Sequence, residues 1–202
     1  MKFDEENVEN NMFFINKLWN AARFVYCNIE TSPLTSLPTG EGERGDIVEI
    51  EEELIKNYDD LMFHEKWILS RIKYLTDLVT ESMEKYSFSE AGQELQAFTK
   101  NEFCDYYIEE FKLTKDTSKY GNKVITYVLN VLLKLLHPYI PFVTEEIYDK
   151  LGFSPYLIEA LWPNVKLPRD IELEKNNTLL FDLIKEVRNI RAENNILPNK
   201  SI

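Results

Sequence analysis

Apolar side chains recur every three or four residues along most of this chain, which is the spacing of one face of an α-helix. The pattern is strongest at 122–136, where ten of the 15 residues are apolar and lie nearly all round the helix. Only six glycines occur among the 202 residues, and no useful length of sequence alternates apolar and polar residues as a strand does. We therefore predict an all-α protein, with residues 122–136 as its central and most buried helix.

The ends of the expected helices come from turn and capping residues. Ser87 begins a Ser-x-x-Glu sequence, which predicts a capping box at the start of a helix, and Gly152 stands where a helix is expected to stop. Connections of moderate length between long helices imply antiparallel neighbours, so we predict an antiparallel helical bundle of about five to six helices. These helices are expected at roughly 4–28, 59–86, 87–112, 122–136, 142–151 and 177–194, with a further short one at 47–55.

Negative charge is unevenly distributed along the chain, whose net charge is −12. Residues 41–60 hold nine acids and only two cations, and prolines and glycines are frequent just before them. We predict a helical bundle at 1–175 with an irregular acidic insertion at about 31–58, followed by a C-terminal helix and connecting segment at 176–202. Because the rest of the chain is close to neutral, a local cationic face is compatible with the composition.

No catalytic residue and no metal site are assigned from the sequence. His64 and His137 have no Cys, His or Asp partner at ligand spacing, and no glycine-rich phosphate loop occurs. Cys27 and Cys104 are far apart and are expected to be buried free thiols. The chain begins without a signal-peptide pattern, and its longest apolar run, 128–136, is far shorter than the ~20 residues of a membrane span. We expect a cytoplasmic protein without membrane contact.

The segment FFINKLWNAARF, residues 13–24, combines aromatic rings, amides and cations without any acid. In helical projection a broad apolar stripe that includes Met12, Trp19 and Tyr26 is expected to face the core. Two interpretations of the opposite face remain open. It is a solvated stripe whose two rings pack under the acidic loop, or it is a surface for unstacked bases, each worth ~1–3 kcal/mol when stacked on a ring. That face spans about 120° and contains Phe13, Asn16, Lys17, Asn20, Arg23 and Phe24.

Five blocks of sequence, in order along the chain, resemble one family. They are INKLWNAARFV (15–25), EKWILSRI (65–72), NEFCDYYIEEFK (101–112), LLHPYIPFVTEEIYDKL (135–151) and VRNIRAENNILPNK (187–200). Together they resemble the anticodon-binding domain of valyl-tRNA synthetases, which are class I aminoacyl-tRNA synthetases. The fourth block is shared with the isoleucine and leucine enzymes, whereas the first, third and fifth are more characteristic of the valine enzymes.

The resemblance implies a role for particular residues. Phe24 would stack on a base, Lys17 and Arg23 would contact phosphates or base edges, and the amides would read base edges. Arg188 and Arg191 would contact the tRNA stem or the catalytic body, although ion pairing with neighbouring acids is an equal alternative. The anticodon-binding residues carried over from the family are Asn16, Lys17, Asn20, Arg23, Phe24 and Asn28.

A complete enzyme of this family joins valine to tRNA(Val) with ATP and magnesium. Its nucleotide-site signatures, His-Ile-Gly-His and Lys-Met-Ser-Lys-Ser, do not occur here, so the resemblance implies a recognition domain without a cofactor of its own. We also expect this domain to be a monomer. Its partners would be tRNA(Val) and the remainder of the synthetase chain. The alternatives are the same domain of an isoleucine or leucine enzyme, or an acidic helical scaffold that holds a partner helix with Phe13 and Phe24.

Overall fold

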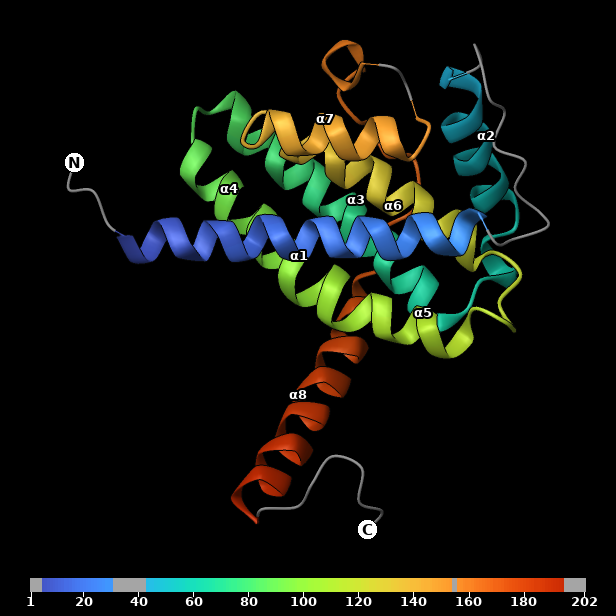
Figure 1. Cartoon of the computed structure of the whole chain (residues 1–202). Helices are drawn as coiled ribbons and strands as arrows, with labels where there is room; N and C mark the ends of the chain where they lie inside the picture. The colour runs from blue at the N-terminus through green and yellow to red at the C-terminus, as the bar shows by residue number, and fades with distance from the viewer. Residues whose placement is uncertain (1–4, 31–42, 154–155, 195–202) are drawn as a thin grey trace. The chain divides into compact units, whose positions relative to one another are not determined.

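The computed structural model describes residues 5–30, 43–153 and 156–194 (Figure 1). These ranges contain helices and turns but no strand, which confirms the all-α prediction. Two 3₁₀ turns, η1 (Tyr58–Asp60) and η3 (Leu157–Glu159), and one π-helix, η2 (Phe98–Tyr107), accompany the α-helices. The α-helices in these ranges are α1 (Glu5–Glu30), α2 (Glu43–Lys56), α3 (Phe63–Glu84), α4 (Phe88–Ala97), α5 (Ile108–Thr114), α6 (Gly121–Leu136), α7 (Pro141–Lys150) and α8 (Ile171–Glu193).

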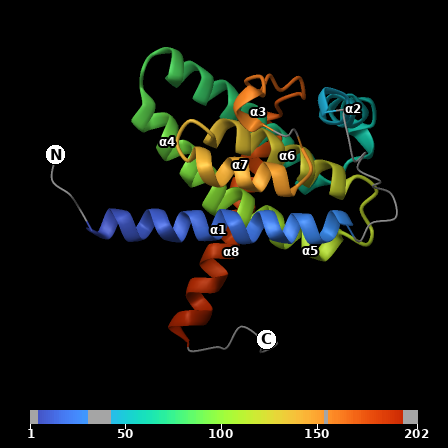
Figure 2. The ribbon, with the colours of Figure 1, turned by 45° about the horizontal axis from the view of Figure 1, so that its top comes forward.

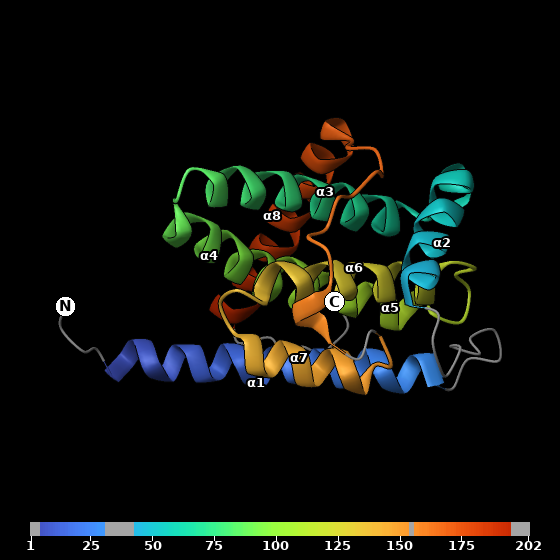
Figure 3. The same ribbon diagram turned by 90° about the horizontal axis from the view of Figure 1, so that it is seen from above.

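Helix α6 occupies the centre of the bundle. All of its residues are buried except Asn122, Lys123 and Lys134, as expected for a helix that is apolar nearly all round. It packs against α3 and α4 on one side and against α1 and α7 on the other (Figure 3). The helix ends at Leu136, although His137 keeps helical φ and ψ of −54° and −41°. Pro138 follows and has no N–H with which to continue the i to i−4 hydrogen bonds.

The helix predicted at 87–112 is present, but it changes its winding. The chain passes from α4 through the π-helix η2 into α5 without a break. The predicted capping box is wrong, because the Ser87 side chain makes no capping hydrogen bond. Ser87 follows Tyr86, which has a positive φ of 60°, and its own ψ of 54° is not the extended geometry typical of a capping residue. A comparable cap occurs at α3, where the backbone N–H of Met62 donates to Oε2 of Glu65 at 2.8 Å.

The acidic segment contributes one helix to the bundle. α2 packs against α6 at one end of the unit (Figure 2), with Leu54 fully buried between them. The carboxylate of Glu51 is also buried; it accepts hydrogen bonds from the hydroxyl of Tyr127 at 2.5 Å and the backbone N–H of Lys166 at 2.7 Å. Burial, and then the Glu51 carboxylate, raise the pKa of Tyr127. Residues 31–42, the rest of the predicted loop, lie outside the described ranges.

The chain divides into two compact units, residues 1–169 and residues 170–202. The second unit contains α8, which begins six residues before the predicted start at 177. Asp170 explains the earlier start, because its Oδ1 accepts a hydrogen bond from the backbone N–H of Leu173 at 2.9 Å and so caps the first turn. Glu172 and Glu174 in that turn also complement the helix dipole.

Candidate nucleic-acid interface

The buried face of α1 is rotated relative to the predicted stripe. Met12 is 60% exposed and Tyr26 is exposed, whereas both were expected in the core. Trp19, also assigned to the core, is only half-buried. The apolar surface of the helix is wide enough for one strip to meet η2 and α6 while the adjoining strip meets α7. The buried strip consists of Phe14, Leu18, Ala21, Ala22 and Val25.

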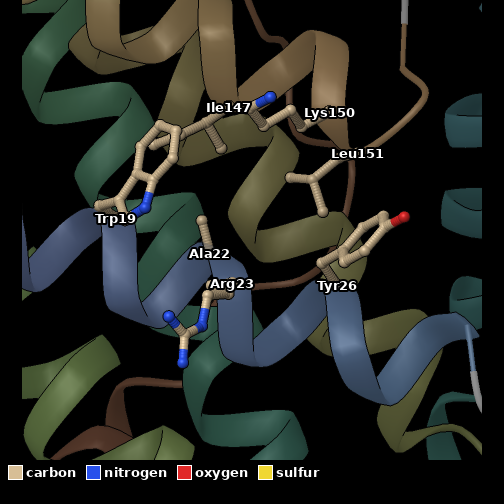
Figure 4. A pocket seen from close by; sticks show the side chains of 7 residues that line it. All are labelled: Trp19, Ala22, Arg23, Tyr26, Ile147, Lys150 and Leu151. Carbon is tan, nitrogen blue, oxygen red and sulfur yellow. The ribbon is translucent and has the colours of Figure 1, made fainter.

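A groove of about 340 Å³ lies between α7 and the strip of α1 that adjoins the buried one (Figure 4). Its α1 wall is formed by residues spaced i, i+3, i+4 and i+7, which is one helical face. Trp19 and Tyr26 stand toward its two ends, with Ala22 between them (Figure 4). The residues that line the groove are Trp19, Ala22, Arg23, Tyr26, Ile147, Lys150 and Leu151.

Two cations belong to this groove. Arg23 is exposed, and no described residue forms a hydrogen bond or ion pair with it. In Figure 4 its guanidinium extends away from the side chains of α7. Lys150 lies on the α7 wall and pairs with Glu146, with Nζ and Oε1 3.0 Å apart. Because both partners are largely exposed, this pair contributes little stability and leaves the ammonium accessible to another anion.

The residues carried over from the family fall into two groups. Asn16, Asn20 and Arg23 are exposed and follow one another at i, i+4 and i+7, so they share one outward face of α1. Lys17 is half-buried and its Nζ lies 2.7 Å from Oδ1 of Asp105 on η2. Its positive charge is therefore already balanced within the bundle.

Phe24 and Asn28 are engaged with α5 and the turn after it. The ring of Phe24 meets that of Phe111 edge-on, with centroids 6.0 Å apart, and Nζ of Lys112 lies 5.3 Å from its centroid. Nδ2 of Asn28 donates to the carbonyl oxygen of Phe24 at 2.7 Å, and Nζ of Lys115 donates to Oδ1 of Asn28 at 3.4 Å. These contacts make Phe24 a half-buried packing residue, so its assignment as a stacking platform stays a prediction.

Arg188 and Arg191 both lie on α8, in the second unit. Arg191 is half-buried, and the side chain of Arg188 lies outside the described part of the structure. Their predicted contacts with a tRNA stem or with a catalytic body therefore stay predictions.

In the described ranges, no three His, Cys, Asp or Glu side chains are arranged to hold a metal ion. Burial raises the pKa of Cys104 to about 12, so its thiol stays protonated near neutral pH. Cys27 is exposed, so the prediction that it is buried is wrong. None of the helices within the described ranges is long and apolar enough to span a bilayer.

The sequence pattern placed Trp19 and Tyr26 in the core, whereas Trp19 is half-buried and Tyr26 is exposed at the groove, and it did not identify Lys150. The sequence position of Arg23 could have indicated that Trp19 is partly accessible, because residues 19 and 23 are one turn apart and so share a helical face. Lys150 had no local signal, because its place in the groove depends on how α7 docks against α1.

The described ranges thus form an all-α bundle with a groove of rings and cations along its first helix. The chain belongs to the family described as the anticodon-binding domain of tRNA ligases, which matches residues 65–202. This family assignment confirms the resemblance derived from the sequence.

Full-length relatives extend the match across α1. The chain is 37% identical to the valine–tRNA ligase of Bacillus thuringiensis subsp. konkukian over 210 residues, which cover 100% of the chain and 22% of the relative. It is 36% identical to the valine–tRNA ligase of Listeria innocua and 33% identical to that of Pseudothermotoga lettingae, with 100% of the chain covered in both and 22% and 21% of the relatives. The chain thus spans about a fifth of the length of these curated relatives. These matches favour the valine enzymes over the isoleucine or leucine alternative and over a protein scaffold.

Proposed function

We propose that this chain is the tRNA-recognition part of a valine–tRNA ligase and that it holds the anticodon loop of tRNA(Val) along α1. The whole protein would use ATP and magnesium to join valine to that tRNA. The observation that carries the proposal is the groove between α1 and α7, where Trp19 and Tyr26 are accompanied by Arg23 and Lys150. Its presence in a domain whose relatives are valine–tRNA ligases supports tRNA(Val) as the ligand.

The roles follow from exposure and chemistry. An unstacked base inserts beside the indole of Trp19 or the ring of Tyr26, because aromatic faces stack on any base. Arg23 and Lys150 meet the phosphates that flank this base, while the exposed amides of Asn16 and Asn20 reach base edges. Lys17 contacts the RNA only when its ammonium leaves Asp105 and pairs with a phosphate instead.

The first experiment measures binding of tRNA(Val) to the 202-residue chain by fluorescence anisotropy over a range of salt concentrations. Arg23→Ala is expected to weaken binding and to lower the slope of log K against log salt by about 1, because one phosphate contact is lost. Lys85→Gln is the matched control, since Lys85 is an exposed cation paired with Glu81 and lies neither in the α1–α7 groove nor on the outward face of α1. Equal binding by wild type and Arg23→Ala would show that α1 is not the tRNA-binding site.

A second experiment tests the identity of the RNA. In the full-length enzyme, changes to the middle and third anticodon bases of tRNA(Val) are expected to reduce aminoacylation far more than changes in the variable arm. If anticodon changes have no effect, then the groove recognises another part of the RNA.

A further inference from the structure

The two rings of the α1–α7 groove are regularly spaced along one face of α1. Trp19 and Tyr26 are seven residues apart, which is close to two helical turns, so both project from the same side of the helix. At about 1.5 Å per residue, their Cα atoms are separated by about 10.5 Å along the helix axis. Stacked bases follow one another at about 3.4 Å, so a ring, two bases and a second ring span three steps, or about 10.2 Å. The spacing of the two rings therefore fits a pair of stacked bases.

The α1 wall leaves the space between the two rings open. Ala22 contributes only a methyl group there, and the guanidinium of Arg23 extends away from α7 (Figure 4). Ala22, Ile147 and Leu151 are 4%, 3% and 4% exposed, so they form a closed apolar floor. A ligand therefore lies over this floor and between the side chains at its rim, rather than deep inside the bundle.

The side chains at the rim are two rings and two cations. Arg23, Tyr26 and Lys150 are exposed, and Trp19 is half-buried. Because the floor beneath them is apolar, it offers no hydrogen-bonding side chain to the edge of a base. A base in this groove is therefore held by its faces, and every base has such faces.

Arg23 lies at the level where two stacked bases would be linked. Its place in the sequence is half a residue from the midpoint between Trp19 and Tyr26, which is about 0.8 Å along the helix axis. The phosphate that joins two neighbouring nucleotides lies between the levels of their bases. Since no described residue forms an ion pair with Arg23, its guanidinium is available to that phosphate.

We propose that the groove holds two adjacent, stacked bases of an unpaired RNA segment between Trp19 and Tyr26, with the phosphate that links them on Arg23. Both rings then lie across the helix axis, one at each end of the pair. The inference rests on the proposed function, because it takes RNA as the ligand. It adds the number of bases in the groove, their mutual stacking, and a common role for the two rings.

The test is an abasic scan of the RNA hairpin that contains the anticodon stem and loop of tRNA(Val). Each loop nucleotide in turn loses its base but keeps its ribose and phosphate, and binding to the 202-residue chain is measured by fluorescence anisotropy. Two adjacent positions should each weaken binding by about 5- to 150-fold. A single sensitive position, or sensitive positions without an adjacent pair, would overturn the proposal.

Ring variants assign each base to its ring. Trp19→Leu and Tyr26→Leu keep apolar bulk but remove the flat face, and urea denaturation checks that each variant is folded. In each variant the effect of one of the two abasic changes should shrink by at least about fivefold while the effect of the other persists, because only one base contacts the missing ring. The two variants should act on different positions of the pair.

Tyr26 is exposed, so Tyr26→Leu gives a clear result even if Trp19→Leu is destabilised. Tyr156→Leu is the matched control, because it removes an exposed ring that does not line the groove, and it should leave the whole scan unchanged. If a folded Tyr26→Leu variant gives the same scan as wild type, or if both ring variants act on the same position, then the rings do not enclose one stack and the proposal is wrong.

A neutral methylphosphonate at the linkage between the two sensitive bases tests the role of Arg23. It should weaken binding to wild type by at least about tenfold, and it should weaken binding to Arg23→Gln by less than about twofold, because the contact is already absent. Equal losses in both proteins would overturn the contact between Arg23 and this phosphate.

Failure of the proposed function has a different appearance. In that case wild type does not bind the hairpin, or it binds the hairpin no better than Arg23→Ala does, and the present inference falls with it. If hairpin binding is intact and depends on Arg23 but the scan shows no adjacent pair, then only the stacked pair is wrong.

Discussion

Lys17 and Asp105 form an ion pair that joins α1 to η2, with Nζ and Oδ1 2.7 Å apart. The pair is partly exposed, so it is worth at most about 1 kcal/mol, and a phosphate can compete for the ammonium. Arg23 has no such partner among the described residues. The cationic character of α1 therefore depends on Arg23 and on how firmly Asp105 retains Lys17.

Asp105→Asn should strengthen tRNA(Val) binding. The change removes one carboxylate and leaves Lys17 available, so the slope of log K against log salt should become steeper by about 1. The free energy of unfolding should change by less than about 1 kcal/mol. Asp77→Asn is the matched control, because Asp77 is as exposed as Asp105, at 58%, and pairs with Lys73 at 2.7 Å on α3. Similar gains in both variants would indicate a general effect of net charge.

Trp19→Ala should weaken tRNA(Val) binding by about 1–3 kcal/mol, the value of one base stacked on a ring. Trp19→Phe should recover most of that loss, because a smaller ring still offers a stacking face. Affinity is measured by anisotropy and stability by urea denaturation. A loss of stability without a loss of affinity would return Trp19 to the core, where the sequence pattern first placed it.

Phe24→Ala should act chiefly on stability. The ring is half-buried against Phe111, so its loss should lower the free energy of unfolding by about 2 kcal/mol, roughly half the cost for a fully buried phenylalanine. Phe13→Ala is a suitable comparison, because Phe13 is 68% exposed on the same helix and should leave the urea midpoint nearly unchanged. If Phe24→Ala instead reduces tRNA affinity with stability intact, then the family's stacking role applies to Phe24.

Helical periodicity was sufficient to predict α6, because a helix that is apolar nearly all round can lie only at the centre. It was insufficient for α1, whose apolar surface is divided between the core and the groove. The pattern of Trp19, Ala22 and Tyr26 looks the same whether it faces a packed helix or a cavity. Lys150 joins the groove only through the docking of α7, which is a tertiary contact without a local signature. The Ser87 cap was wrong because Ser87 has a ψ of 54° and not the extended backbone of a capping residue, which the Ser-x-x-Glu pattern does not reveal.

Tyr127→Phe should loosen α2. The hydroxyl of Tyr127 donates to the buried carboxylate of Glu51. In the variant this carboxylate keeps only the backbone N–H of Lys166 as a donor. A buried carboxylate that loses a donor costs about 1–3 kcal/mol. Hydrogen exchange of the α2 amides should accelerate more than that of α3. Tyr156→Phe, at an exposed tyrosine, should leave both rates unchanged.

His64 should make stability depend on pH. Its ring is buried at the start of α3, its Nε2 lies 3.1 Å from Oγ1 of Thr114, and its ring centroid is 6.0 Å from that of Tyr107. Burial lowers the pKa of His64 below its usual 6.5, and this effect outweighs the opposing charges of Glu65 and Glu110. In the window below 6.5 the unfolded chain therefore binds more protons than the folded chain, so the free energy of unfolding falls as pH falls.

Urea denaturation from about pH 8 to about pH 5 measures this effect. His64→Gln should be less stable than wild type at the upper end, because the contact with Thr114 is altered, and the difference should shrink toward the lower end as wild type loses stability. His137→Gln leaves His64 in place and should retain the pH dependence due to it. A constant difference between wild type and His64→Gln across the whole range would mean that His64 has the same pKa in the folded and unfolded chains.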